Sequence, residues 1–401
     1  MESSVTTCGG TREFPAKPRT YTGNVSGPLD GLKVLELAGI GPSPYACMLL
    51  ADLGANVLRL ERGDPDADTN VSWDLLNRSR PSVALDMKNE AGRDLVLELC
   101  EQADVLIEGF RPGVTERLGL GPDDVWARNP RLVYGRMTGY GQDGPLAQSA
   151  GHDINYIAVS GALWPLGRAG EKPVAPMNLV GDFGGGALFL AFGVLAAVLS
   201  ARESGEGQVV DAAMVDGTAS MLTMTHSFLN MGFWKEERGV NILDSGAHFY
   251  EVYETSDHKY MAVGAVEAKF YAALLEGLEL SEVELPAQMD RASWPAMKQR
   301  FITIFAGKTR DEWTNIFAGV DACVTPVLSP REAAAHPYNS ARDVFDTSDA
   351  IQPQTAPRFS KTPGKIQSPP RSPGAGTKEG LLNWGIDEQR QASLRAAGAF
   401  G

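Results

Sequence analysis

The sequence predicts an α/β fold in which a parallel, doubly wound sheet forms a large domain beside a smaller α+β domain. Short apolar runs alternate with stretches of helical length, which is typical of strands joined by helices. The 401 residues exceed what one compact core usually accommodates. The hydrophobic fraction of 43% and the charged fraction of 21% are those of a globular protein.

The elements of the expected large domain follow in order along the first half of the chain. Two segments, 41–55 and 89–102, have helical spacing. Short apolar runs predict strands over 31–38, 56–62, 82–88, 103–110 and 131–140. Because ligands of parallel sheets lie beyond the carboxyl ends of the strands, we expect the functional residues in the loops there.

The segment 184–201 carries no charge and just reaches the length of a membrane-spanning helix. Three glycines open it, and its flanks lack basic or aromatic anchors. We therefore expect a fully buried helix in a large domain, and no membrane association.

A smaller domain is expected over 241–328. After a turn, a short strand and a helix start at 205–217, the segment 248–266 predicts a β-hairpin, and 267–278 and 309–320 predict helices. The stretch 360–380 is rich in Pro, Gly and Ser, which indicates an extended segment that lies on the surface or is flexible.

Charge and cysteine usage exclude several classes of protein. The net charge of −14 argues against a nucleic-acid-binding protein. Cys8, Cys47, Cys100 and Cys323 are scattered without metal-ligand spacing, which favours reduced thiols in an intracellular protein and no metal site. The N-terminus lacks the apolar core of a secretory signal. We expect a plain extension and a cytoplasmic protein, with mitochondria or peroxisomes as the alternatives in a eukaryote.

Two glycine-rich motifs imitate nucleotide-binding sequences. "GIGPSP" at 39–44 stands between a strand and a helix like a dinucleotide fingerprint, but Pro44 occupies the third glycine position, which argues against a nicotinamide cofactor. "GDFGG" at 181–185 resembles a kinase motif without the other kinase motifs. From residue types alone, Asp182 is either a helix cap or a catalytic carboxylate.

The same ambiguity applies to "GHD" at 151–153 and to the cations near the strand ends. His152 and Asp153 either begin a helix or act as acid and base. Cations beyond successive strand ends would suit phosphates, or they are ordinary solvated loop residues. These cations are Arg62, Arg78, Arg80, Lys88 and Arg111.

Several motifs together resemble the family III CoA-transferase superfamily and, within it, the α-methylacyl-CoA racemases. They are "PLDGLKVLELAGIGPSPYACMLLADLGANVLRLER", "DVLIEGFRPGVTERLGLG", "MTGYGQDGP", "GHDINYIAVSG", "NLVGDFGGGALFL", "GQVVDAAMVDG" and "YMAVGAVEAKFY", and the likeness covers about 28–359.

The resemblance implies a Rossmann-like large domain joined by linkers to a small domain, and an interlocked homodimer. Each active site would lie between the large domain of one subunit and the small domain of the other. The chain would then divide into an N-terminal extension, the large CoA-binding domain, a linker, the small domain, and a return linker with the C-terminal part of the large domain. These parts are 1–27, 28–215, 216–240, 241–328 and 329–401.

The resemblance also implies racemisation of 2-methyl-branched acyl-CoA thioesters at the α-carbon. His152 and Asp182 would be the two acid/base groups, and Glu267 would pair with the histidine across the subunit interface. The backbone N–H of Asp153 would help to hold the enolate oxygen. No cofactor is expected besides the CoA of the substrate, and no metal. The expected CoA contacts are Arg62, Arg78, Met87, Lys88, Arg111 and Tyr156.

Three other functions compete with racemisation. A CoA-transferase of the same family would use Asp153 as its nucleophile. The preceding His152, the "INY" run that follows, and the presence of Asp182 and Glu267 favour the racemase. A catalytically silent acyl-CoA-binding protein and a dehydrogenase are less well supported. The remaining histidines match no catalytic motif, and the sequence does not specify the acyl chain, since apolar pockets discriminate weakly.

Overall fold

The computed structural model describes residues 27–63 and 73–400, so the predictions for the N-terminal extension lie outside the described residues. Within them, six strands form a parallel sheet in the order β3-β2-β1-β4-β5-β6. This is the strand order of the Rossmann fold, so the predicted doubly wound sheet is confirmed. The strands are β1 (Lys33–Leu37), β2 (Asn56–Glu61), β3 (Ser82–Ala84), β4 (Val105–Glu108), β5 (Val133–Thr138) and β6 (Val209–Ala213).

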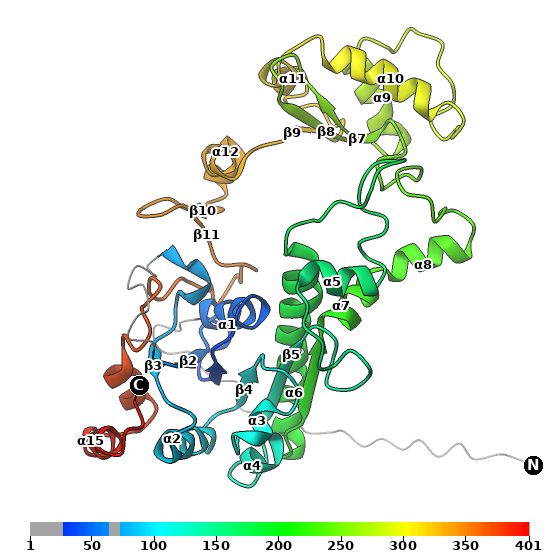
Figure 1. Cartoon of the computed structure of the whole chain (residues 1–401). Helices are drawn as coiled ribbons and strands as arrows, with labels where there is room; N and C mark the ends of the chain where they lie inside the picture. The colour runs from blue at the N-terminus through cyan, green and yellow to red at the C-terminus, as the bar shows by residue number, and fades with distance from the viewer. Residues whose placement is uncertain (1–26, 64–72, 401) are drawn as a thin grey trace, which may run out of the picture.

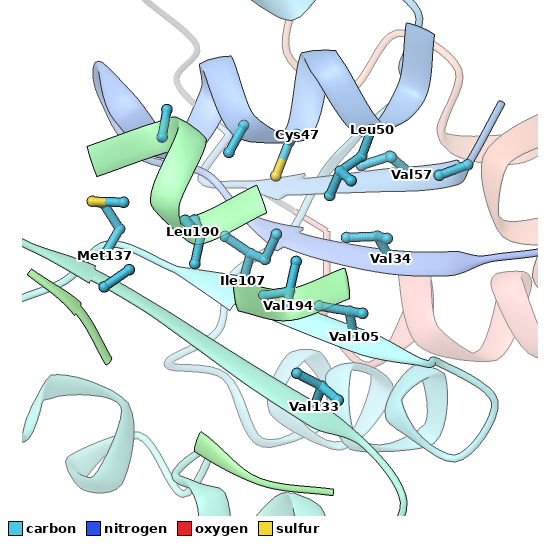
Figure 2. Packing of buried hydrophobic residues seen from close by; sticks show 14 of the residues in the cluster. Val34, Cys47, Leu50, Val57, Val105, Ile107, Val133, Met137, Leu190 and Val194 are labelled. Atoms are coloured by element: carbon cyan, nitrogen blue, oxygen red, sulfur yellow. The ribbon is translucent and has the colours of Figure 1, made fainter. Parts of the chain in front are cut away.

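Helices cover both faces of this sheet because successive strand residues point to opposite faces. On one face, Val34 and Val105 pack against α1 (Pro42–Asp52) and α6 (Leu188–Ser204), as Figure 2 shows. On the other, Leu35 packs with α2 (Glu90–Cys100), which begins at the predicted place. The shorter helices of this part are α3 (Val114–Arg117), α4 (Pro122–Trp126), α5 (Asp153–Val159) and α7 (Met214–Met221), and α8 (Thr223–Asn230) extends from α7 away from the sheet (Figure 1).

The C-terminal residues pack on the same sheet. Leu381 and Trp384 are fully buried in the cluster that holds α2, and the indole N–H of Trp384 donates to Asn56 Oδ1 at 3.1 Å. The Pro-rich stretch lies along the surface, where the Ser79 N–H donates to the Ser368 carbonyl at 2.9 Å. The elements of this part are α12 (Pro330–Ala335), α13 (Pro337–Ala341), β10 (Phe345–Asp346), β11 (Gln352–Pro353), α14 (Thr377–Asn383) and α15 (Glu388–Ala396).

A second core lies in a three-stranded antiparallel sheet at the other end of the fold in Figure 1. The predicted hairpin is confirmed, and so are the two helices around it. Aromatic side chains fill this core, with Tyr253 stacked on Phe305 at 4.9 Å between ring centroids. The elements are β7 (Tyr250–Glu254), β8 (Tyr260–Gly264), β9 (Val324–Pro326), α9 (Ala268–Gly277), α10 (Trp294–Phe305) and α11 (Arg310–Ile316).

The apolar helix is longer and less buried than the sequence predicts. A π-helix over Leu179–Ala187 continues directly into α6. Together they form the one helix among the described residues with the length and hydropathy of a membrane span, and 39% of its most apolar window is buried. One face packs against β5, β6 and α1, whereas Phe192 is 73% and Leu199 66% exposed. The prediction of full burial is therefore wrong for the single chain.

Candidate active site

A cavity of about 580 Å³ opens at the carboxyl ends of β1, β4 and β5. The strand order reverses between β1 and β4, which is where parallel sheets of this type bind their ligands. Loops that leave these strands therefore supply most of the wall. The lining residues are 40–43, 109–112, 137–140, 147, 149–152, 155–156, Asp182 and Met214.

His152 enters this cavity from the start of α5. It is the residue before the first helical turn, with extended backbone angles, and its N–H donates to the Asn155 side-chain oxygen at 3.0 Å. Its side chain is exposed. The predicted helix start at Asp153 is confirmed. Because the backbone N–H performs the capping contact, the imidazole is left to face the cavity.

Asp182 reaches the same cavity from the first turn of the π-helix. It is half-buried, and its Oδ2 accepts a hydrogen bond from the Asn178 amide at 3.3 Å. Burial raises the pKa of Asp182; the Asn178 hydrogen bond opposes that rise, the Asp153 charge adds to it, and His152 opposes it. The structure thus brings His152 and Asp182 to one cavity.

The glycines of both nucleotide-like motifs serve close packing around Asp182. A Cβ on Gly41 would lie 3.1 Å from Asp182 Oδ2, and one on Gly185 would lie 2.5 Å from the Thr218 side chain of α7. Gly41 also has a φ of +74°, which other residues rarely adopt. Gly41 and Gly185 therefore let α1, the π-helix and α7 approach one another beside the cavity.

The carboxylate of Asp153 lies outside the cavity. Only 5% of the residue is exposed, and its Oδ2 accepts a hydrogen bond from the Asp182 N–H at 2.7 Å. Adjacent residues of the chain thus face in different directions. The Asp153 side chain meets the π-helix, while His152 faces the open space.

Two loops of the cavity wall are held by a buried pair that the sequence analysis missed. Glu108, the last residue of β4, accepts a hydrogen bond from the Phe110 N–H at 2.7 Å. Arg136 of β5 lies 3.5 Å from Glu108 and donates to the Gln142 side chain at 2.8 Å. Burial raises the pKa of Glu108 to about 7, against the lowering effects of the Phe110 N–H and Arg136. The sequence offered one signal for this pair, because Glu108 and Arg136 are charged residues within otherwise apolar strands.

Tyr156 and Arg111 are the expected CoA contacts that line the cavity. The Tyr156 hydroxyl donates to the Gly151 carbonyl, and its ring packs edge-on against Tyr140 at 5.0 Å between centroids. Arg111 is exposed after β4. Tyr156 therefore fixes the turn before His152, and Arg111 brings an exposed positive charge to the cavity wall.

The other expected CoA contacts lie outside this wall. Arg62 and Lys88 are exposed, and Met87 is half-buried against the core cluster that contains α2. Arg78 is a correction: it is 3% exposed, and its guanidinium bonds to Asp52 at 2.7 Å and to the Pro353 carbonyl at 2.8 Å. Arg78 therefore joins α1 to the C-terminal segment, and its guanidinium is buried among these partners.

Glu267, the predicted partner of His152, also lies outside the cavity wall of this single chain. It precedes α9 in the antiparallel part and is exposed, and its charge acts on the thiol of Cys323. Among the described residues, no three His, Cys, Asp or Glu side chains are grouped so that they could hold a metal ion.

Comparison with known proteins gives a consistent result. A family model described as CoA-transferase family III matches residues 29–379. The alpha-methylacyl-CoA racemases of mouse and human are each 45% identical to the chain over 372 residues, which cover 92% of this chain and 96% of each relative. The crystal structure of a CaiB/BaiF family protein from Brucella suis superposes with a TM-score of 0.77 at 24% identity, covering 90% of this chain and all of that one.

Proposed function

The chain belongs to CoA-transferase family III, and we propose that it racemises 2-methyl-branched acyl-CoA thioesters at the α-carbon. The observation that carries the proposal is the shared cavity of His152 and Asp182. Inversion of a carbon centre needs one group to remove a proton from one face and another to return a proton to the opposite face. A histidine and a carboxylic acid from different elements provide such a pair.

The environment of Asp182 suits both halves of this reaction. A general acid/base works best when its pKa lies near the working pH, and burial moves the pKa of Asp182 in that direction. Half of the catalytic cycle uses the carboxylate and the other half the acid. His152, exposed to the cavity, takes the complementary protonation state in each direction.

The negative charge that develops on the thioester oxygen needs a donor in a fixed position. The backbone N–H of Asp153 is the first of α5, where the positive end of the helix dipole adds to its effect. Its neighbour Tyr156 holds the preceding turn. We therefore assign the enolate oxygen to this helix start.

The CoA moiety would follow the basic residues beyond the strand ends. Arg111 lies in the cavity wall, and Arg62 and Lys88 follow β2 and β3 with exposed side chains. Exposed cations of this kind bind phosphates. Met87 and Tyr156 would add apolar contacts. Arg78 is left out of this set because it is buried and bonded to Asp52 and Pro353.

An interlocked homodimer would account for two features of the single chain. The exposed face of α6 would be covered by a second copy, since an apolar surface of this kind favours association. Glu267 of the partner subunit would reach His152 and stabilise its protonated form. In this arrangement 28–215 and 329–401 form the large domain, 241–328 the small one, and 216–240 the linker.

The alternative, a CoA-transferase with Asp153 as nucleophile, has less support. A nucleophile must reach the thioester carbonyl, but Asp153 is 5% exposed and its carboxylate faces the π-helix. The high identity to racemases over nearly the whole chain points the same way.

The proposal is tested by incubating the protein with a single (2R)-2-methylacyl-CoA in D₂O. We expect deuterium at C2 and the appearance of the 2S epimer, measured by NMR and chiral separation after hydrolysis. A parallel reaction with a free carboxylic acid tests for CoA transfer. Without deuterium at C2 the racemase assignment fails, and transfer to the added acid would establish the alternative. A panel of acyl chains of different bulk then defines the preferred substrate.

A further inference from the structure

We propose that the side chain of Asp153 is a positioning group, which holds the backbone of Asp182 so that the Asp182 carboxylate faces the substrate. The inference rests on the proposed racemisation and assigns the Asp153 carboxylate a task distinct from that of its N–H. It also explains how a racemase keeps the aspartate that a transferase of this family would use for covalent catalysis.

The first support is the direct contact between the two residues. Asp153 Oδ2 accepts the Asp182 N–H at 2.7 Å, although the residues lie on different elements. Asp182 is the fourth residue of the π-helix, where the N–H groups have no acceptor within the helix. Asp153 supplies that acceptor, and an ionised acceptor makes a stronger hydrogen bond than a neutral one.

The second support is the fit around this contact. A Cβ on Gly181 would lie 2.6 Å from Asp153 Oδ2, so the carboxylate occupies the space that any other residue at 181 would fill. Asp153 is buried, and it is absent from the cavity wall that includes His152, Asn155 and Asp182. Its side chain can therefore hold the π-helix but cannot reach a thioester in the cavity.

The third support is electrostatic. Asp153 Oδ1 is buried and has no hydrogen-bond partner among the described residues, and no cation there pairs with this carboxylate. Its charge therefore acts on Asp182, whose pKa it raises in addition to the larger effect of burial. The other groups that face Asp182 are Asn178 and His152, which lower its pKa.

The charged residues of the remaining elements packed on the π-helix have no effect on the pKa of Asp182: Arg136 of β5 is buried but pairs with Glu108, and Asp211 of β6 is exposed. From α1, Tyr45 packs on the Phe183 ring at 4.4 Å between centroids. The acidic residue of α7, Asp216, is exposed. In α5, Tyr156 is influenced by the Asp182 charge and is itself held at Gly151. Asp153 is thus the one group on these elements that both binds Asp182 and raises its pKa.

The test uses the His152→Ala variant, in which Asp182 is the one remaining acid/base group of the proposed pair. In His152→Ala, Asp182 can still remove the C2 proton of one epimer and return deuterium to the same face, so exchange in D₂O without inversion reports on Asp182. Exchange should rise with pH as Asp182 ionises. Asp153→Asn is then added, since its side-chain oxygen can still accept the Asp182 N–H while the charge is removed.

We expect the pH midpoint of exchange to be lower in His152→Ala/Asp153→Asn than in His152→Ala. In Asp153→Ala, which loses the acceptor as well, kcat for racemisation should fall about tenfold while KM changes little, because the Asp182 N–H is left unsatisfied. Asp387→Asn is the matched control: Asp387 also accepts a helix N–H, that of Arg390, but at α15. When it is added to His152→Ala, Asp387→Asn should leave the pH midpoint of exchange unchanged.

An unchanged midpoint in the double variant would overturn the inference, provided that His152→Ala itself exchanges. Complete loss of activity in Asp153→Asn, with an acyl adduct on Asp153 of the unsubstituted protein trapped by hydroxylamine, would overturn it in favour of a nucleophile. Absence of any exchange by the unsubstituted protein would instead refute the proposed function. Circular dichroism and thermal unfolding show whether each variant is folded.

Discussion

Two groups of charged or titratable residues lie around the same sheet: one is buried in ion pairs, and the other is exposed at the cavity. Beside α1 and β2, charged side chains meet each other: Arg78 pairs with Asp52 at 2.7 Å, and Arg80 with Glu36 at 3.2 Å. We call these four residues the ion-pair cluster. At the cavity, His152 and Arg111 are exposed instead. Arg78 and Arg111 are the same type of residue and both lie in loops beside strands of the sheet, but only Arg78 is buried with a carboxylate partner.

Burial explains why the ion-pair cluster cannot serve a ligand. All four side chains are at most 3% exposed, and removing a charge from water is costly unless a partner compensates for it. Burial raises the pKa of Glu36, and the charges of Arg80 and Arg59 oppose that rise. The attraction between these paired side chains therefore stabilises the fold. The exposed side chains at the cavity can instead lose their water to a bound substrate.

The largest predicted effect is on catalysis, at the cavity. His152→Ala and Asp182→Asn should each lower kcat for racemisation by about 10²- to 10⁴-fold, since each removes an acid/base group. Their melting temperatures should stay close to that of the unsubstituted protein, because His152 is exposed and Asp182 half-buried. Racemisation assays with thermal unfolding measure both quantities. Activity within a few-fold of the unsubstituted protein would show that the acid and base lie elsewhere.

The ion-pair cluster should respond in the opposite way. Arg78→Met leaves Asp52 charged and buried without its partner, and should lower the free energy of unfolding by about 3–5 kcal/mol. Urea denaturation measures this loss. Arg331→Met is the control at an exposed arginine of α12. If Arg78→Met retains full stability but binds acyl-CoA poorly, Arg78 is a ligand contact after all.

Glu108 shares a property with each group: it is buried like the ion-pair cluster, and it holds a loop of the cavity wall. Its pKa of about 7 in the folded chain exceeds the ordinary value of 4.5, so the folded state binds its proton more tightly than the unfolded state. The stability that it contributes is present below pH 4.5 and is lost as pH rises to about 7.

Glu108→Gln should therefore be less sensitive to pH over that window. Relative to the variant, the unsubstituted protein should lose about 1 kcal/mol of unfolding free energy per pH unit. Denaturation of both proteins at several pH values measures the difference. Parallel stability curves would mean that Arg136 and the Phe110 N–H keep Glu108 ionised throughout.

The smallest predicted effect is that of Arg111→Ala. An exposed cation contributes little to binding, so KM for acyl-CoA should rise roughly fivefold at low salt, with the melting temperature unchanged. The increase should shrink at high ionic strength, because salt screens the interaction with phosphate. Steady-state kinetics at two salt concentrations provide the measurement. A fall in melting temperature instead would place Arg111 with the ion-pair cluster.

Much of the fold was predictable because its signals are local. The strands that became β1, β2, β4 and β5 are mostly apolar, as is usual for sheets buried on both faces, and their predicted limits exceed the observed ones by at most two residues. His152 and Asp182 were ambiguous from their own motifs, and only the resemblance to the family paired them; in the structure both line the same cavity.

What could not be predicted depends on contacts between distant residues. Arg78 and Arg111 looked equivalent, but the partners of Arg78 come from 52 and 353, which no local pattern links to it. The helix α6 is apolar all round, so its sequence could not show that one face would remain exposed in the single chain. The contact between Asp153 and Asp182 spans 29 positions and was equally hidden.

The most direct test of the account is the stereochemistry of exchange in the two catalytic variants. In D₂O, His152→Ala and Asp182→Asn should each exchange the C2 hydrogen of one epimer only, with retention of configuration, and the two variants should select opposite epimers. That mirror-image result would place the two residues on opposite faces of the substrate. Exchange of the same epimer by both variants, or inversion by either, would contradict a two-base mechanism at this cavity.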